Sequence, residues 1–321
     1  MTQPDLEIIQ IPNAATYWPV APTDVVLGVP LAARLLLGAT PLGALVQATA
    51  YGAYLGNALQ DWVARQDIRK IDFYREFGAD LHRLKAMSRE EREAEVRTLS
   101  QRLNDGYTGE RIPRRELAVE VDRHLTRYIA SITGQHVGTS VEVRDFSLAV
   151  VLFPFALGAC DMLSGDVAVF RDLDAFEPHV IAHEFSHRKG YWRELEAQAL
   201  AYLSLTSSGE PLLVQSALCE RLHRQLRVLV SHDVRAFRER IEQSDLRAEL
   251  RTQFLKLDQG RDSTADGDLE NLMRNLYDAR MRLTGQNGLS DYDLGFTNFL
   301  YTFEHRATPP QKAITAAPSQ P

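Results

Sequence analysis

Two histidines four residues apart, His183 and His187, enclose an acid in the run HEFSH. On a helix, residues i and i+4 lie one above the other on one face, so both imidazoles can reach one Zn²⁺ ion at about 2.0–2.1 Å. Glu184 lies on an adjacent part of the same turn, where it can act as general base on a zinc-bound water. The spacing therefore predicts a helix that carries a metal site. A third ligand must come from another part of the chain.

The residues around this motif favour two consecutive helices. Ala175–Ile181 places apolar residues at helical spacing before the motif, and Gly190 suits the position just after a helix. Trp192–Leu205 then resumes a helical pattern. Two helices joined at a glycine allow the second to bring an acid back to the metal, and the candidate acids are Glu194 and Glu196.

Composition excludes several classes of protein. The chain has 321 residues, of which 45% are hydrophobic and 25% charged, so a disordered or collagenous protein is excluded. A net charge of −7 disfavours general nucleic-acid binding. Two cysteines, Cys160 and Cys219, exclude a disulfide framework. The acidic start, MTQPDLEIIQ, lacks the basic region of a cleaved signal peptide, so we expect a cytoplasmic or inner-membrane-associated protein.

The first part of the chain divides into a proline-rich stretch and an apolar one. Residues 1–24 contain four prolines and predict an extended arm. Residues 25–60 are the most apolar, and Leu35 to Leu55 carry no charge over about the length that a bilayer core requires. Proline, glycine and alanine keep the hydropathy borderline, so this segment is either a buried helical hairpin or a membrane segment. A ridge of small residues could also join copies of the chain into a homo-oligomer: Ala44, Ala48, Gly52 and Gly56.

The remaining segments predict the fold class. Residues 61–135 read as polar helices. In the segment 136–305, Val137–Phe153 and Gly165–Phe170 are rich in β-branched residues and predict strands, and the pattern is helical afterwards. Residues 306–321 predict a disordered tail. We expect an α+β, predominantly helical protein, in which a small β-sheet presents Gly165–Phe170 as an edge strand beside the motif helix, preceded by a helical N-terminal region.

The run VIAHEFSHRKGYWRELEAQALAYLSL, which starts at Val180, resembles the bacterial domain of unknown function 3810 family. These are zinc-metallopeptidase-like proteins that often carry N-terminal membrane segments. The resemblance extends more weakly over about residues 145–303, and Gln198 stands where the family has asparagine. The positions that match the family pattern are His183, Glu184, His187, Gly190, Arg193, Glu194, Glu196, Ala197, Ala201 and Tyr202.

The resemblance implies a gluzincin-like site in a zincin-like metallopeptidase domain over residues 136–305. It implies that His183, His187 and Glu196 hold Zn²⁺, because a glutamate followed by alanine is the usual third ligand of such enzymes. Tyr292 lies in the family-like segment Gly288–Leu300 and is the first candidate to stabilise the oxyanion. The weaker candidates for this role are His232, Tyr277 and Tyr202.

The expected function is zinc-dependent hydrolysis of peptide bonds in a peptide or protein substrate. One alternative is a zinc hydrolase or modifying enzyme that acts on a small or specialised substrate, for which a closed pocket is expected instead of an open strand edge. Another is a catalytically silent zinc scaffold or regulator, which would not need Glu184. His179 is expected to lie at the surface or to support the ligands. The carboxylates that could orient a metal-bound histidine are Asp172, Asp174 and Glu194.

Overall fold

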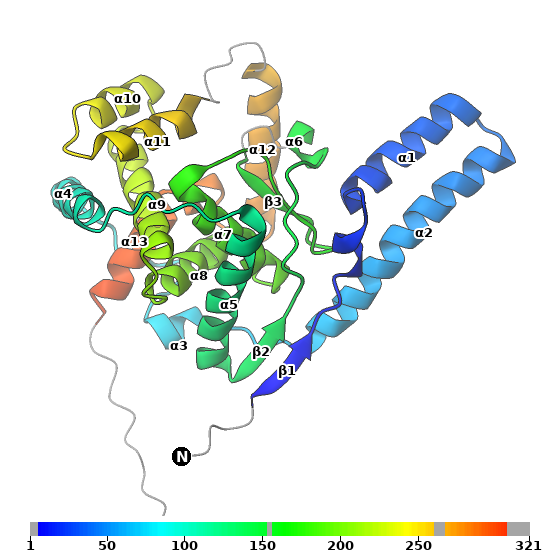
Figure 1. Cartoon of the computed structure of the whole chain (residues 1–321), viewed down its shortest axis with the longest axis horizontal. Helices are drawn as coiled ribbons and strands as arrows, with labels where there is room; N and C mark the ends of the chain where they lie inside the picture. The colour runs from blue at the N-terminus through cyan, green and yellow to red at the C-terminus, as the bar shows by residue number, and fades with distance from the viewer. Residues whose placement is uncertain (1–5, 153–155, 260–266, 307–321) are drawn as a thin grey trace, which may run out of the picture.

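The computed structural model of the chain describes residues 6–152, 156–259 and 267–306. Most of these residues are helical, and the strands form two small two-stranded sheets. The predicted α+β, predominantly helical class is therefore confirmed. Figure 1 shows a helical body with α7 inside it, and a hairpin of α1 and α2 that projects from one side.

The elements follow one another along the chain with short connections. The first half contains β1 (Glu7–Gln10), α1 (Pro22–Leu37), α2 (Pro41–Ala64), α3 (Phe73–Phe77), α4 (Arg89–Asp105), α5 (Arg114–Thr133), β2 (Gln135–Gly138) and α6 (Ala149–Leu152). The second half contains β3 (Gly158–Cys160), β4 (Val167–Val169), α7 (Glu177–Arg188), α8 (Glu194–Thr206), α9 (Pro211–Leu229), α10 (Val234–Glu242), α11 (Ala248–Gln259), α12 (Gly267–Leu283) and α13 (Leu294–Glu304).

The segment predicted as an extended arm contributes a strand to the body. β1 pairs in parallel with β2, with Glu7 opposite Gln135. Ile11 is fully buried directly after β1. The start of the chain is therefore anchored to the end of α5 before it enters α1.

The apolar segment 25–60 forms a helical hairpin, but the hairpin is not buried. Leu35 and Leu36 are 76% and 82% exposed, and a side chain added at Gly52 or Gly56 would meet open space. The expectation of a buried hairpin is wrong, because α1 and α2 pack against each other and only the base of the hairpin reaches the body. In the described part of the chain, no helix combines the length and the apolar character needed to cross a membrane.

The strand predicted over Val137–Phe153 is mostly absent. β2 ends at Gly138, Arg144 forms a single bridge to Ala168, and α6 is one helical turn. The preference of β-branched residues for strands depends on a neighbouring strand to pair with. Among the described residues, this segment pairs only where β2 meets β1, at Val137 and Gly138, and at the bridge of Arg144 to Ala168. The strand predicted over Gly165–Phe170 is confirmed as β4.

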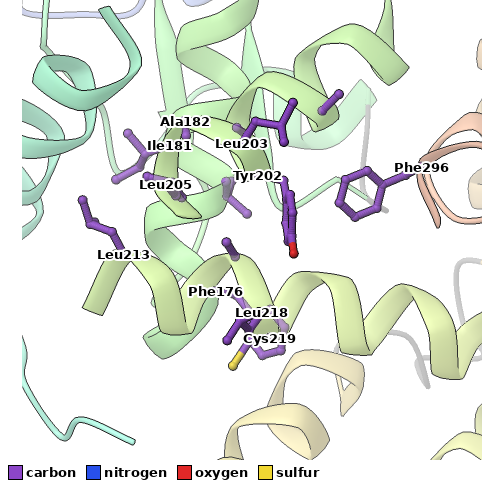
Figure 2. Close-up of a cluster of buried hydrophobic side chains, with 14 of the residues drawn as sticks. Phe176, Ile181, Ala182, Tyr202, Leu203, Leu205, Leu213, Leu218, Cys219 and Phe296 are labelled. Carbon is purple, nitrogen blue, oxygen red and sulfur yellow. The ribbon is translucent and has the colours of Figure 1, made fainter. Parts of the chain in front are cut away.

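The motif helix α7 lies in the middle of the hydrophobic core. All of its residues are buried, and it contacts α5, α8, α9 and both strands of the β3–β4 sheet. Figure 2 shows part of the surrounding core, where Phe176, Tyr202 and Phe296 pack near the helices that carry the site. Because packing surrounds α7 on all sides, its side chains are held in fixed positions.

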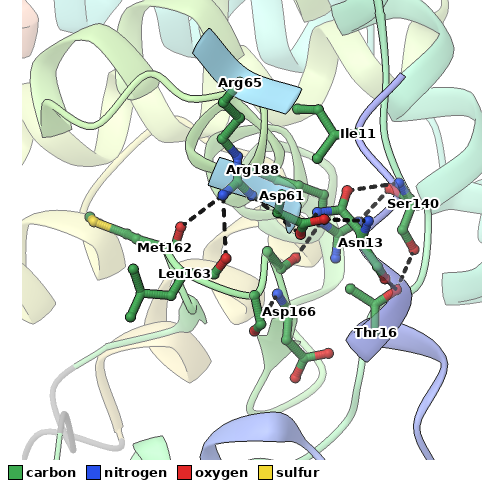
Figure 3. A network of polar contacts seen from close by, with 12 residues as sticks. Ile11, Asn13, Thr16, Asp61, Arg65, Ser140, Met162, Leu163, Asp166 and Arg188 are labelled. Carbon is green, nitrogen blue, oxygen red and sulfur yellow. Dashed lines mark hydrogen bonds and ion pairs between the residues drawn. The ribbon is translucent and has the colours of Figure 1, made fainter. Parts of the chain in front are cut away.

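A buried arginine fastens the end of α7 to the loops around it. Arg188 is fully buried, and its guanidinium donates at 2.5 to 2.7 Å to the backbone carbonyls of Gly165, Ser140 and Glu142. In the same corner, the Asn13 side chain donates to Asp61 at 2.7 Å, which ties the segment before α1 to the end of α2 (Figure 3). These bonds satisfy the Arg188 guanidinium and the Asn13 side chain where the hairpin joins the body.

Candidate metal centre

Three ligand atoms converge between the end of α7 and the start of α8. His183 Nε2 lies 3.1 Å from His187 Nε2, and Glu194 Oε2 lies 3.1 Å from the first nitrogen and 3.2 Å from the second. All three residues are buried. The predicted helix is therefore present, and it brings the two imidazoles of the motif to one point.

This triangle fits a zinc ion. Zinc–ligand bonds of 2.0–2.1 Å in a tetrahedron place ligand atoms about 3.3 Å apart, close to the separations found here. His187 Nδ1 lies 2.7 Å from the Tyr191 carbonyl oxygen, which can only accept. The proton of the neutral ring is therefore on Nδ1, and Nε2 presents a lone pair to the centre. Two imidazoles and one carboxylate leave a fourth position open, as in catalytic zinc sites.

The third residue of the candidate ligand group is Glu194. The prediction that Glu196 is the third ligand is therefore wrong. Successive helix residues are about 100° apart, so two positions along α8 place a side chain about 200° around the axis. Glu194 is the first residue of α8 and faces α7. Glu196 turns to the other side, where the charges that act on it include those of Arg193 and Lys70.

A ring of hydrogen bonds holds Glu194 in place. The Tyr277 hydroxyl on α12 donates to Glu194 Oε1 at 2.5 Å, and the Glu194 backbone N–H donates to the side-chain oxygen of Gln286 at 2.9 Å. Tyr292 lies next to Tyr277, and the two hydroxyl oxygens are 3.5 Å apart. Asp172 and Asp174, which were candidates to support the histidines, instead pair with Lys256 on α11.

The turn between α7 and α8 is fixed by Gly190 and Lys70. Gly190 has a φ of +90°, in the region that favours glycine, and an added Cβ would lie 2.4 Å from Lys70 Nζ. The lysine donates to the Gly190 carbonyl at 2.7 Å. This turn sets the distance at which Glu194 meets the two histidines.

Burial and the nearby charges shift the pKa values of the site in opposite directions. Burial raises the pKa of Glu184, and the neighbouring His183 and His187 oppose this only in part. Burial would lower the pKa of His187, but Glu194 outweighs it and the pKa rises to about 9. Burial would likewise raise the pKa of Glu194, but the two imidazoles hold it well below its usual range. Glu194 is thus an anion, whereas Glu184 is suited to gaining and losing a proton.

The structure separates the residues that were considered for the oxyanion. Tyr292 has its ring 6.0 Å from that of His183, and burial raises its pKa so that the hydroxyl keeps its proton. Tyr277 also reaches the site through Glu194. Tyr202 lies in the core and accepts from Arg221, and His232 is half exposed beside Asp293. Neither residue is therefore placed to act at the triad of His183, His187 and Glu194.

Two cavities meet at Glu184. One of about 390 Å³ is lined by the triad and continues along β3, and one of about 130 Å³ lies on the other side of His183. Gly158 borders both, and a Cβ added there would lie 3.2 Å from Glu184 Oε1. A larger cavity of about 530 Å³, near Arg114 and Pro178, contains none of the triad.

The edge strand beside the site is β3 and not β4. β4 pairs with β3 on one side and forms the bridge to Arg144 on the other, so the prediction that Gly165–Phe170 is the free edge is wrong. Directly before β3, the Leu157 carbonyl accepts from the Phe170 N–H. The backbone groups of a strand alternate in direction, so those of Gly158 and Cys160 point away from β4. Among the described residues, no strand pairs with this outer edge.

Only weak sequence signals mark the groups that come from distant segments. Tyr277 and Gln286 reach Glu194 from about 80 to 90 residues farther along, and no local pattern marks them. The choice between Glu194 and Glu196 depends on how many residues the turn uses. The start of α8 at Glu194 is the only local feature that could have favoured the correct acid.

Comparison with known proteins agrees with the resemblance in the motif region. No curated protein and no solved structure matches the chain. Residues 170–301, which contain the whole triad together with Tyr277 and Tyr292, are similar to the family described as "Protein of unknown function (DUF3810)".

Proposed function

We propose that this protein is a zinc-dependent metallopeptidase. The observation that carries the proposal is the convergence of His183, His187 and Glu194 beside Glu184, a carboxylate that takes no part in the triangle. A purely structural zinc site needs closed coordination and no base. A hydrolase needs an open position and a carboxylate within reach of it.

The residues would share the chemistry as follows. His183, His187 and Glu194 would hold Zn²⁺, which acts as a Lewis acid on a water molecule and a peptide carbonyl. Glu184 takes a proton from the attacking water, whose oxygen bonds to the carbonyl carbon. The C–N bond then breaks, and the same proton passes from Glu184 to the departing amine. The raised pKa of Glu184 suits this exchange.

Two tyrosines are placed to assist. Tyr292 and Tyr277 both keep their protons, because burial raises the pKa of each phenol. Tyr277 already donates to Glu194, so it orients the ligand. Tyr292 is the better candidate to donate to an oxyanion, because it lines both cavities that meet at Glu184.

The free edge of β3 favours a peptide over a small substrate. An extended peptide can add to the outward N–H and C=O groups of Gly158 and Cys160 as another strand. This would place one of its bonds beside Glu184, because Gly158 lies against that carboxylate. The cavity of about 390 Å³ along β3 leaves room for residues on one side of the bond.

The test is a Glu184→Gln variant in a screen of peptides and unfolded proteins, with wild-type protein loaded with zinc. We expect wild type to cleave and the variant to retain its zinc while losing at least about a hundredfold in kcat. Glu196→Gln is the matched control and should keep both metal and activity. Equal cleavage by Glu184→Gln and wild type would refute the role of Glu184, and absence of cleavage by zinc-loaded wild type would refute the peptidase proposal.

A further inference from the structure

An arginine lines the larger of the two cavities at Glu184 and takes no part in the hydrolysis proposed above. The cavity of about 390 Å³ is bordered by the triad and by Glu184, and Arg280 on α12 borders it as well. Arg280 is exposed, so a molecule in the cavity can reach it from water. A cavity of this size accommodates a single ligand, and a ligand that contacts Glu184 can therefore also contact Arg280.

Two contacts place the guanidinium of Arg280 at the cavity wall. Its Nη2 donates to the sulfur of Met162 at 3.4 Å, and its Cζ lies 5.5 Å from the centre of the Tyr277 ring. Met162 and Tyr277 both line the same cavity. The charged head of Arg280, and not only its aliphatic stem, therefore borders the cavity.

These contacts leave the charge of Arg280 without an anion. A thioether sulfur is a weak acceptor, whereas a guanidinium has five N–H donors. In the part of the chain that the structure describes, Arg280 forms no ion pair with a carboxylate. Arg282, two residues farther along α12, does pair with one, that of Asp278, at 2.7 Å. Arg280 is therefore a cation at the cavity that can still bind an anionic group of a ligand.

The other acids of the cavity wall are held by donors of their own. Asp161 accepts from the hydroxyl groups of Tyr54 and Ser164, at 2.9 and 2.6 Å. Asp166 pairs with Arg144 at 2.8 Å. The remaining acids of the wall are those of the candidate metal centre. A carboxylate that enters the cavity would therefore meet a guanidinium that no acid of the wall neutralises.

The position of Arg280 relative to β3 gives its spacing from the cleaved bond. Gly158, the first residue of β3, lies against Glu184, and Met162 follows two residues after the end of the strand. A peptide added to the outer edge of β3, with its cleaved bond beside Gly158, advances about 3.3 Å per residue. A residue about two positions from that bond would reach the end of β3, where Met162 contacts Arg280.

We propose that Arg280 binds a carboxylate of the peptide substrate, about two residues from the cleaved bond. The carboxylate is either the side chain of an aspartate or glutamate or the C-terminus of the peptide, since both present two oxygens to the planar fork of the guanidinium. This inference rests on the proposed peptidase function for its substrate. The binding itself requires no hydrolysis, so it can be measured separately.

Binding of short peptides tests the site without turnover. Four probes are titrated into zinc-loaded Glu184→Gln protein and followed by NMR: acetyl-alanyl-glutamate amide, acetyl-alanyl-glutamine amide, acetyl-alanyl-glutamine with a free C-terminus, and acetyl-alanyl-lysine amide. We expect at least one of the two carboxylate probes to bind about fivefold or more tightly than the glutamine amide, and the one that does identifies the source of the carboxylate. If neither does so, or if the lysine probe binds most tightly, the proposal is overturned.

Variants on α12 assign the preference to one side chain. In the same background, Arg280→Met and Arg280→Gln should each bring the preferred carboxylate probe to within about twofold of the glutamine amide. Arg282→Met is the matched control and should keep the preference. Circular dichroism confirms that each variant is folded. A folded Arg280 variant that keeps the preference would overturn the assignment, because the carboxylate would then bind the zinc ion or another group. Loss of the preference in folded Arg282→Met would overturn it as well.

Zinc-loaded wild type is then assayed on peptides that carry glutamate or glutamine two residues from the cleaved bond, each with a free or an amidated C-terminus. We expect kcat/KM to be about fivefold higher for the peptide with the carboxylate that is preferred in binding. If the probes bind as expected but no peptide is cleaved, the peptidase proposal fails and the carboxylate site remains. If peptides are cleaved without this preference, the carboxylate proposal fails and the peptidase remains.

Discussion

The buried helix α7 and the exposed hairpin of α1 and α2 reverse the usual relation between polarity and burial. α7 ends in Arg188, a charged residue without exposed surface, whereas Leu35 and Leu36 at the tip of the hairpin are more than three-quarters exposed. Arg188 is tolerated inside because three carbonyl groups accept its N–H donors. The leucines stay outside because the hairpin has only its own two helices to pack against. Burial therefore follows from the partners that the fold supplies.

The largest effect should come from removing the buried guanidinium. Arg188→Met leaves three buried carbonyls without their donor, so we expect a loss of about 3 kcal/mol or more in the free energy of unfolding. Urea denaturation followed by circular dichroism measures this. Arg34→Met, on the exposed surface of α1, is the control and should change the value by less than about 0.5 kcal/mol. Similar losses in the two variants would contradict the contrast between the regions.

Acid should weaken the body through His179. Burial lowers the pKa of His179 to about 4, whereas in the unfolded chain it is near 6.5. The unfolded state therefore binds this proton first as the pH falls, and stability is lost between pH 6.5 and 4, by at most about 3 kcal/mol. His179→Phe should show a shallower fall in stability than wild type over that range. Parallel pH curves for the two proteins would show that His179 is not neutral in the fold.

The hydroxyl of Tyr277 should tune the metal affinity by a smaller amount. Tyr277→Phe removes the donor to Glu194 Oε1, and the loss of such a supporting bond weakens zinc binding about tenfold. Competition with a chromophoric chelator measures the affinity. Tyr51→Phe, on the hairpin, is the matched control and should leave it unchanged. Unaltered affinity in Tyr277→Phe would mean that Glu194 is positioned without this bond.

The smallest effect is expected at the tip of the hairpin. The double change Leu35→Ser and Leu36→Ser exposes no new apolar surface, so the free energy of unfolding should change by less than about 0.5 kcal/mol. Leu200→Ser in α8, where the leucine is fully buried, should cost about 3 kcal/mol in the same assay. A large loss from the two exposed serines would mean that the hairpin packs against the body in solution.

The sequence determined the local part of the site and left the long-range part open. The i, i+4 spacing of His183 and His187 was sufficient to predict a helix and a shared ligand position, because helix geometry depends only on neighbours. The acid at the start of α8 was not distinguishable from Glu196, because the length of the turn is set by Gly190 and by Lys70, a residue more than a hundred positions earlier.

The small sheet was the least predictable part of the fold. β-branched residues indicated strands over Val137–Phe153 and Gly165–Phe170, but only pairing decides which segments form a ladder. β3 is three residues long and contains glycine and alanine, so no propensity marks it. Its role as the edge strand follows from its position between β4 and the cavity at Glu184.

The proposed metal site depends on Glu194 as its third ligand, and the zinc content of matched variants tests this. Wild type, Glu194→Gln and Glu196→Gln are purified in parallel and analysed by inductively coupled plasma mass spectrometry. We predict about one zinc per chain in wild type and Glu196→Gln, and a large loss of zinc in Glu194→Gln. A wild type without zinc after incubation with the metal, or loss of zinc from Glu196→Gln with retention in Glu194→Gln, would contradict the account.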